Sequence, residues 1–260
     1  MNASSENNPQ KPHRGSAQTV FKRYELKYML TFDQKERMLA AMAPYMTLDK
    51  YGRTTIRNLY YDTDSYLLIR RSIEKPVYKE KLRIRSYGRA TEDSTVFVEL
   101  KKKYKHVVYK RRVAMTNQEA ADWLSQTNGA PRHTQISDEI DYFLDYYGTL
   151  HPTLFLSYER EAYYAKDGSD LRITFDDTIL CRQEDLSLTS EVYGTPLLPQ
   201  DRLLMEIKCS GGIPLWMTAV LSREHLYKTS YSKYGTAYKT LIFPQTHQIN
   251  PYLRQEVHTL

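Results

Sequence analysis

The segment VYKEKLRIRSYG (77–88) alternates cationic with apolar side chains. In an extended strand, successive side chains point to opposite faces. The lysines and arginines at positions 79, 81, 83 and 85 would therefore share one face, and Leu82 and Ile84 would occupy the other. This stretch predicts a β-strand with one cationic and one apolar face.

Three further segments repeat this alternation: RYELKYML (23–30), VFVELKK (96–102) and LLMEIKC (203–209). One amphipathic strand alone is ordinarily a solvent-facing strand of an antiparallel sheet. Four related strands that curl into a barrel, with their apolar faces outward under helices, would direct their cations into the interior. Because such an interior repels itself unless it holds water, anions or metal, the pattern predicts a phosphate-binding site.

The rest of the chain supplies further strands and several helices. Period-two alternation predicts about eight strands, near 21–29, 55–61, 78–87, 95–103, 107–114, 154–164, 171–176 and 203–209. Most of them follow one another without an intervening helix. We therefore expect an α+β fold in which an antiparallel β-barrel of about eight strands forms a tunnel, with helices packed on the outside.

Capping signals mark the predicted helices. Thr31 with Gln34, and Thr116 with Glu119, match the capping box at a helix start. Apolar spacing predicts a third helix that ends at Gly148 and a fourth that follows Pro214. Residues 129–137 and 183–200 carry turn-forming residues and are expected to be loops.

Length and composition favour one globular domain. The chain has 260 residues, of which 41% are hydrophobic and 26% charged. We expect a disordered tail over 1–19, a single tunnel domain over 20–245 and a C-terminal tail over 246–260. No apolar run is long enough for a signal peptide or a membrane span, and the two cysteines form no CxxC pair, so a cytoplasmic protein with reduced thiols is expected.

Positive charge is concentrated in one part of the chain. Residues 70–112 contain 15 Lys and Arg against 5 Asp and Glu, a surplus of +10, whereas the whole chain carries only +6. The remainder is therefore acidic. Lysines on a solvated face are the ordinary explanation for such a run, but this concentration, placed on alternating strands, favours a polyanionic partner.

The ordered set of motifs resembles a known family. It is similar to the polyphosphate polymerase domain of the vacuolar transporter chaperone (VTC) proteins, a branch of the triphosphate tunnel metalloenzymes related to the CYTH phosphohydrolases. The matching segments are RYELKY (23–28), YYDT (60–63), KLRIRSYG (81–88), VFVELK (96–101), SYER (157–160), LRITFD (171–176), MEIK (205–208) and SKY (232–234). No single segment is specific, but their order is.

The resemblance implies a set of site residues and a cofactor. Arg83, Arg85 and Lys101 would be catalytic, and Glu206 would hold a divalent metal, Mn²⁺ or Mg²⁺. The remaining phosphate-binding residues would be Lys27, Arg160, Arg172, Lys208 and Lys233. Its substrates would be ATP and inorganic polyphosphate.

Two departures from the family bear on activity. Hydrolases of this superfamily usually open with Glu-x-Glu-x-Lys, but here Arg23 replaces the first glutamate, which weakens support for a second metal and favours transfer over hydrolysis. The regulatory domain and membrane helices that accompany eukaryotic relatives are also missing. Phosphate sensing and translocation would therefore come from a membrane partner supplied by another protein, or be absent.

The leading hypothesis is that the γ-phosphate of ATP passes to a growing polyphosphate chain. A metal-dependent triphosphatase or polyphosphatase would use the same tunnel with water as acceptor, and a non-catalytic module would only bind a polyanion. The sequence contains no P-loop, kinase or HExxH motif. Nor does it contain a signature of specific nucleic-acid binding.

Overall fold

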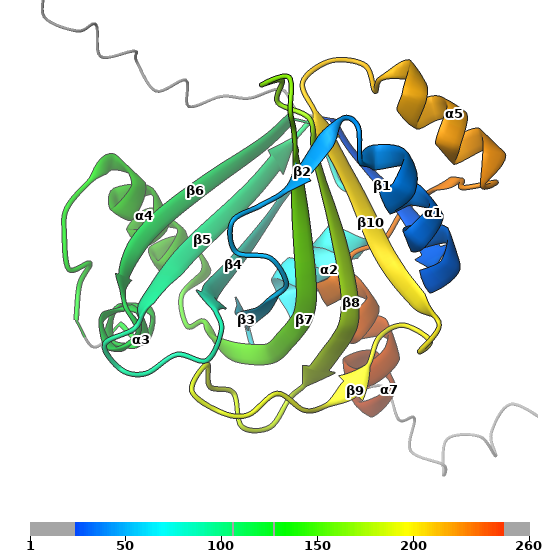
Figure 1. Ribbon diagram of the computed structural model, residues 1–260. Coiled ribbons are helices and arrows are strands. Elements are labelled where there is room, and N and C mark those ends of the chain that lie inside the picture. The colour runs from blue at the N-terminus through cyan, green and yellow to red at the C-terminus, as the bar shows by residue number, and fades with distance from the viewer. Residues whose placement is uncertain (1–23, 106, 127, 247–260) are drawn as a thin grey trace, which may run out of the picture.

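The computed structural model describes residues 24–105, 107–126 and 128–246 (Figure 1). Nearly all of both predicted tails lies outside these ranges. The strands are β1 (Tyr24–Thr31), β2 (Met46–Leu48), β3 (Thr54–Asp62), β4 (Tyr78–Tyr87), β5 (Thr95–Tyr104), β6 (Val107–Thr116), β7 (His151–Ala165), β8 (Arg172–Arg182), β9 (Thr195–Pro196), β10 (Arg202–Cys209) and β11 (Lys228–Thr229). The helices are α1 (Phe32–Met42), α2 (Leu67–Ile73), α3 (Asn117–Leu124), α4 (Gln135–Tyr147), α5 (Leu215–Arg223), α6 (Lys233–Ala237), the π-helix η1 (Tyr238–Ile242) and α7 (Phe243–Thr246).

The strands form one antiparallel sheet that curves around an interior (Figure 1). Its order is β11-β1-β10-β8-β7-β3-β4-β5-β6, with β2 paired to β7 and β9 paired to β8. Within the described residues no hydrogen bonds pair the two edge strands, β6 and β11, so backbone hydrogen bonds do not close the sheet into a complete barrel. The predicted α+β class with an antiparallel, tunnel-type sheet is confirmed, and the strands beyond the predicted set, β2, β9 and β11, are short.

The outer face of the sheet carries two apolar cores under helices. Leu82 and Val98 are fully buried against Trp123 of α3 and Phe143 of α4. On the other side of the barrel, residues of β8 and β10 pack against α1 and α5 in a second cluster that includes Met38. All four helices predicted from the sequence thus lie where the apolar strand faces point, as the alternation requires.

A third apolar cluster occupies part of the inner face. Leu154 and Leu156 of β7 pack there against Ile69 of α2, Tyr234 of α6 and Ile242 of η1. These helical segments were not predicted from the sequence. They cover one part of the concave face, and the charged side chains occupy the rest.

Helix boundaries follow the capping signals. Both predicted capping boxes, at Thr31 and at Thr116, are present. A third box joins Thr134 to Ser137, so α4 begins at Gln135 and the predicted loop over 129–137 is wrong for its last three residues. At the other end of α4, Gly148 adopts a φ of 69°, a backbone conformation that glycine tolerates best.

Helix α2 was not predicted from the sequence, because the side chains that cap it lie several residues before it and not at the position that directly precedes it. Its preceding residue, Tyr66, makes no side-chain cap. Instead the buried Asp62 at the end of β3 accepts hydrogen bonds from the backbone N–H groups of Leu68 (2.8 Å) and Ile69 (3.0 Å). The Thr63 hydroxyl accepts a further hydrogen bond from the Leu67 N–H at 3.0 Å, so two side chains from the segment just before the helix satisfy its start.

The alternation of β4 makes a stability prediction. Leu82→Ala removes a fully buried side chain from the outer core and should lower the free energy of unfolding by about 3 kcal/mol. Leu215→Ala, at an 87% exposed position, should change it by less than about 0.5 kcal/mol. Urea unfolding followed by circular dichroism measures both, and equal effects would contradict the assigned faces of β4.

Candidate functional site

The inner face gathers an excess of positive charge. Eleven lysine and arginine side chains face four carboxylates there, a surplus of seven positive charges when all are ionised. The cations of this interior cluster are Lys27 (β1), Lys81, Arg83 and Arg85 (β4), Lys101 (β5), Lys110 and Arg112 (β6), Arg160 (β7), Arg172 (β8), Lys208 (β10) and Lys233 (α6), and its carboxylates are Glu25, Glu99, Asp176 and Glu206. The interior surplus exceeds the net charge of +6 of the whole chain.

Glu99 of β5 is the centre of one half of the interior cluster. Its carboxylate, 1% exposed, contacts Arg83 at 2.7 Å and Arg112 at 2.6 Å. Lys110 approaches it at 2.7 Å and Arg85 at 3.8 Å. Burial acts to raise the pKa of Glu99, but the surrounding cations outweigh it and hold this pKa well below its usual range. Glu99 is therefore a permanent anion that fixes four cations.

Asp176 and Glu206 organise the opposite half. The fully buried Asp176 receives two hydrogen bonds from Arg160, at 2.5 and 2.6 Å, and one from Lys233 at 2.5 Å. Glu206 lies 2.8 Å from Lys208 and 3.4 Å from Lys27. These contacts join β1, β7, β8, β10 and the start of α6 around one charged region.

Two contacts join elements that are not neighbours in the sheet. The Lys101 ammonium of β5 lies 3.8 Å from Glu25 of β1, although these strands are far apart in the sheet order. Lys81 of β4 donates a hydrogen bond to the hydroxyl of Ser232, just before α6. The charged faces of both halves therefore meet across one interior.

The cations outnumber their counter-ions, and burial together with neighbouring cations lowers the pKa values of Lys81, Lys101 and Lys110. Lys81 and Lys101 are directly opposite on β4 and β5, a pairing of like charges that is unfavourable. Burial, followed by the charges of Lys101 and Lys79, lowers the pKa of Lys81 to about 7. Arg172 stacks over the ring of Tyr164 at 4.8 Å, and its buried Nε lacks a hydrogen-bond partner. An anionic ligand would relieve all of these features.

The carboxylates fit a divalent cation bound together with phosphate. Glu25 and Glu206 both contact the Lys27 ammonium, at 3.1 and 3.4 Å, so two carboxylates border one point of the interior. Magnesium-type ions are commonly bound by one or two carboxylates plus substrate phosphates. Elsewhere in the described part of the chain, His133, Asp138 and Asp141 form a group of three, at the start of α4 and apart from the interior.

Every residue of the predicted site lies in the interior cluster. The predicted residues at positions 27, 83, 85, 101, 160, 172, 206, 208 and 233 all lie on its two halves. The predicted site omitted Lys81, Lys110, Arg112 and Asp176, although alternation along β4, β6 and β8 places each of them on a polar face. Alternation by itself allows either Arg111 or Arg112 to point inward, because a one-residue slip exchanges the two faces. Arg112 points inward, whereas Arg111 pairs with Glu139 of α4 at 2.8 Å.

The curved antiparallel sheet and its cationic inner face define the class of protein: a tunnel-type domain that carries its charged groups inside. The VTC domain family matches residues 22–242, and the chain therefore belongs to this family. No curated protein matches this chain. Within the described ranges, no helix combines the length and apolar character needed to cross a membrane.

One solved structure with low sequence identity supports the fold, and a second has a lower structural similarity. A protein from Bacillus halodurans, described as a candidate adenylate cyclase, is 13% identical with a TM-score of 0.51, over 82% of this chain and 94% of that chain. A candidate adenylyl cyclase from Hippeastrum, described as having a dominant triphosphatase activity, is 14% identical with a TM-score of 0.49, over 87% and 97% of the two chains. The first likeness supports the tunnel-type fold, and the second carries no weight for function.

The lowered pKa of Lys81 makes a pH prediction. An anion favours the protonated form of Lys81, so binding of tripolyphosphate above pH 7 should take up a proton, and this contribution to affinity should fade as the pH rises. Lys81→Arg keeps its charge and should show less proton uptake at pH 8.5. Isothermal titration calorimetry in buffers of different ionisation enthalpy measures the difference, and identical uptake by both proteins would contradict the prediction.

Proposed function

We propose that this protein is a polyphosphate polymerase that transfers the γ-phosphate of ATP to the end of an inorganic polyphosphate chain. The observation that carries the proposal is the interior cluster, in which eleven lysines and arginines face four carboxylates inside a VTC domain. A linear polyanion supplies many closely spaced negative charges. It therefore matches a row of cations along strands better than a single phosphate does.

Charge neutralisation and positioning would supply the catalysis. Arg83, Arg85 and Lys101 lie next to one another on β4 and β5, where they can contact the transferring phosphoryl group and the oxygens that gain charge. The acceptor is a phosphate oxygen that is already ionised near neutral pH. No general base is therefore needed at the reacting end of the chain.

Glu206, with Glu25 beside it, would hold Mn²⁺ or Mg²⁺. The bound ion would neutralise charge on the nucleotide phosphates, as metal ions do in phosphoryl transfer. Lys27 contacts both carboxylates and would keep them from repelling each other. Lys208, Lys233, Arg160 and Arg172 would bind the other phosphates of the two substrates.

The state of the interior carboxylates favours phosphoryl transfer over hydrolysis. The interior provides carboxylates that are each held by cations, and Glu99 is fully engaged by four of them. Such groups are poor bases for activating water. The Arg23 replacement that also favours transfer lies outside the described residues, so its support comes from the sequence alone.

Incubation of the purified protein with ATP and Mn²⁺ or Mg²⁺, followed by ³¹P NMR, tests the function. The proposal requires growth of internal polyphosphate resonances together with ADP. Orthophosphate as the main product would identify a triphosphatase instead. Binding of polyphosphate without nucleotide turnover would identify a polyanion-binding module.

Removal of the paired arginines should abolish synthesis. Arg83→Ala and Arg85→Ala each delete a group that would stabilise developing charge, a loss worth about 10²- to 10³-fold in rate. The double variant should still fold, because Glu99 keeps Lys110 and Arg112. Arg111→Ala, on the outer face, is the matched control and should retain synthesis; equal rates in all variants would refute the assigned roles.

Glu206→Gln tests the metal assignment. Loss of this charge should raise the Mn²⁺ concentration needed for half-maximal synthesis by about tenfold or more. The melting temperature should also fall, because four cations lose a counter-ion. Glu224→Gln, whose carboxylate pairs with Arg37 elsewhere, should leave the metal titration unchanged. A wild-type metal titration in Glu206→Gln would show that Glu206 is a counter-ion only.

A further inference from the structure

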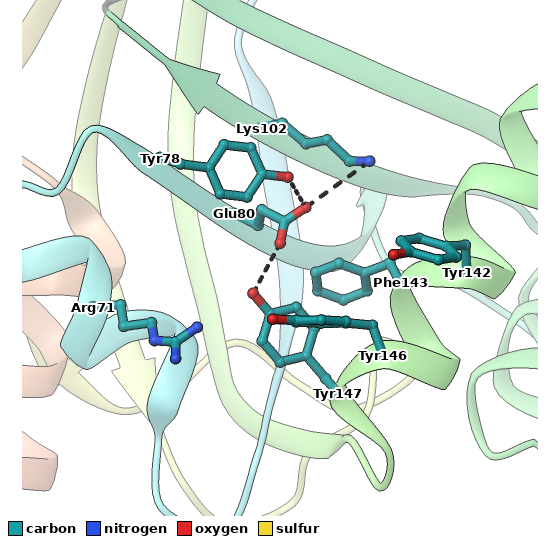
Figure 2. Close-up of a pocket in the computed structure, with 8 residues that line it drawn as sticks. All are labelled: Arg71, Tyr78, Glu80, Lys102, Tyr142, Phe143, Tyr146 and Tyr147. Carbon is teal, nitrogen blue, oxygen red and sulfur yellow. Dashed lines mark hydrogen bonds and ion pairs between the residues drawn. The ribbon is translucent and has the colours of Figure 1, made fainter.

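A pocket lies on the outer face of the sheet, on the opposite side from the interior cluster. It has a volume of about 230 Å³ and opens between α2, β4, β5 and α4 (Figure 2). Its lining includes Tyr78, Glu80, Lys102, Phe143, Tyr146 and Tyr147. Glu80 and Lys102 are directly opposite on β4 and β5, at positions that alternate with the interior cations. A ligand here would therefore be separated from the interior by the sheet.

The floor of the pocket is a buried carboxylate. Glu80 is only 7% exposed and shares its strand face with the fully buried Leu82. It accepts hydrogen bonds from the hydroxyl groups of Tyr78 and Tyr147, the latter at 2.9 Å, and Lys102 lies 3.9 Å away (Figure 2). A carboxylate offers about four acceptor positions, so Glu80 can accept a further donor.

The walls are aromatic and partly open to solvent. Tyr147 packs against Phe143 and Tyr146 with ring centroids 4.8 and 4.9 Å apart. Tyr146 stacks with Tyr142, and these two rings are 64% and 69% exposed. Ring faces beside a carboxylate form an environment that attracts a cation. Arg71 of α2 lines one side of the pocket (Figure 2).

The acidic residues of α4 extend the preference for cationic ligands beyond the pocket. The helix carries Asp138, Glu139, Asp141 and Asp145 and no basic residue, in a chain whose net charge is +6. A second hollow of about 450 Å³ adjoins the pocket and is lined by Gln135, Asp138, Glu139, Tyr142 and Lys102. Glu80 and the four acids of α4 outnumber the bases Arg71, Lys102 and Arg111, although only Glu80, Asp138 and Glu139 among these acids line the two hollows. Two hollows joined along one helix fit an extended segment better than a single small cation.

The geometry points to a protein-binding surface: the pocket above Glu80 and the acidic, tyrosine-bearing face of α4 bind a basic peptide segment of a partner, with an arginine side chain in the pocket. The planar guanidinium would donate to Glu80 and stack on the tyrosine rings. Tyrosine and arginine are the residues that contribute most at protein interfaces. This inference is independent of the reaction in the interior.

A labelled peptide tests the inference. The probe is a fluorescein-labelled peptide with arginine at every third position, GRGGRGGRG, titrated with the full chain by fluorescence anisotropy without polyphosphate. We expect it to bind at least about tenfold more tightly than the same peptide with citrulline, because citrulline lacks the charge. No binding up to about 1 mM, or equal binding of both peptides, would overturn the inference.

Variants locate the binding. Tyr142→Ala with Tyr146→Ala removes two exposed rings and should leave the fold intact. The affinity of this double variant for the arginine peptide should fall by about tenfold or more. Glu80→Gln should lower the affinity by a similar factor. Tyr227→Ala, at a 79% exposed position elsewhere, is the control and should have no effect. Unchanged affinity in the double variant, or complete displacement of the peptide by spermidine at equal concentration, would rule out this surface as a peptide site.

Discussion

Repulsion among the interior cations is the constraint on which the arrangement of this protein depends. Four carboxylates, of which Glu99, Asp176 and Glu206 are buried, each contact between two and four lysines or arginines, yet a surplus of positive charge remains inside the sheet. Partial pairing allows the domain to fold, because unpaired buried charges are very costly. The unbalanced remainder gives the interior its affinity for anions. Burial, and after it the charges of neighbouring cations, lowers the pKa of Lys81.

The two-faced strands allow one sheet to serve both stability and binding. On β4, Leu82 packs under the helices while Arg83 contacts Glu99 inside. A shift of one residue in register would exchange these faces and bury cations in the apolar core. The apolar packing of the outer face therefore also fixes the geometry of the inner face, which explains how a flexible arginine becomes a positioned group.

Charge is separated across the thickness of this sheet. The interior is strongly basic, whereas α4 on the outside is acidic and presents tyrosines over the Glu80 pocket (Figure 2). A polyanion inside and a basic segment outside would not compete for the same surface. The two binding chemistries can therefore coexist in one small domain, since the sheet and its apolar core lie between them.

Local pattern determined much of this protein. Alternation predicted the strand faces, and the capping boxes at Thr31 and Thr116 predicted two helix starts, because both depend on residues within a few positions of each other. The tertiary structure decided which charges meet. Glu99 holds cations from β4 and β6, and Lys101 reaches Glu25 across the interior, because strand order and curvature bring distant segments together. For the same reason, only the fold could reveal the Glu80 pocket, whose walls come from separate elements.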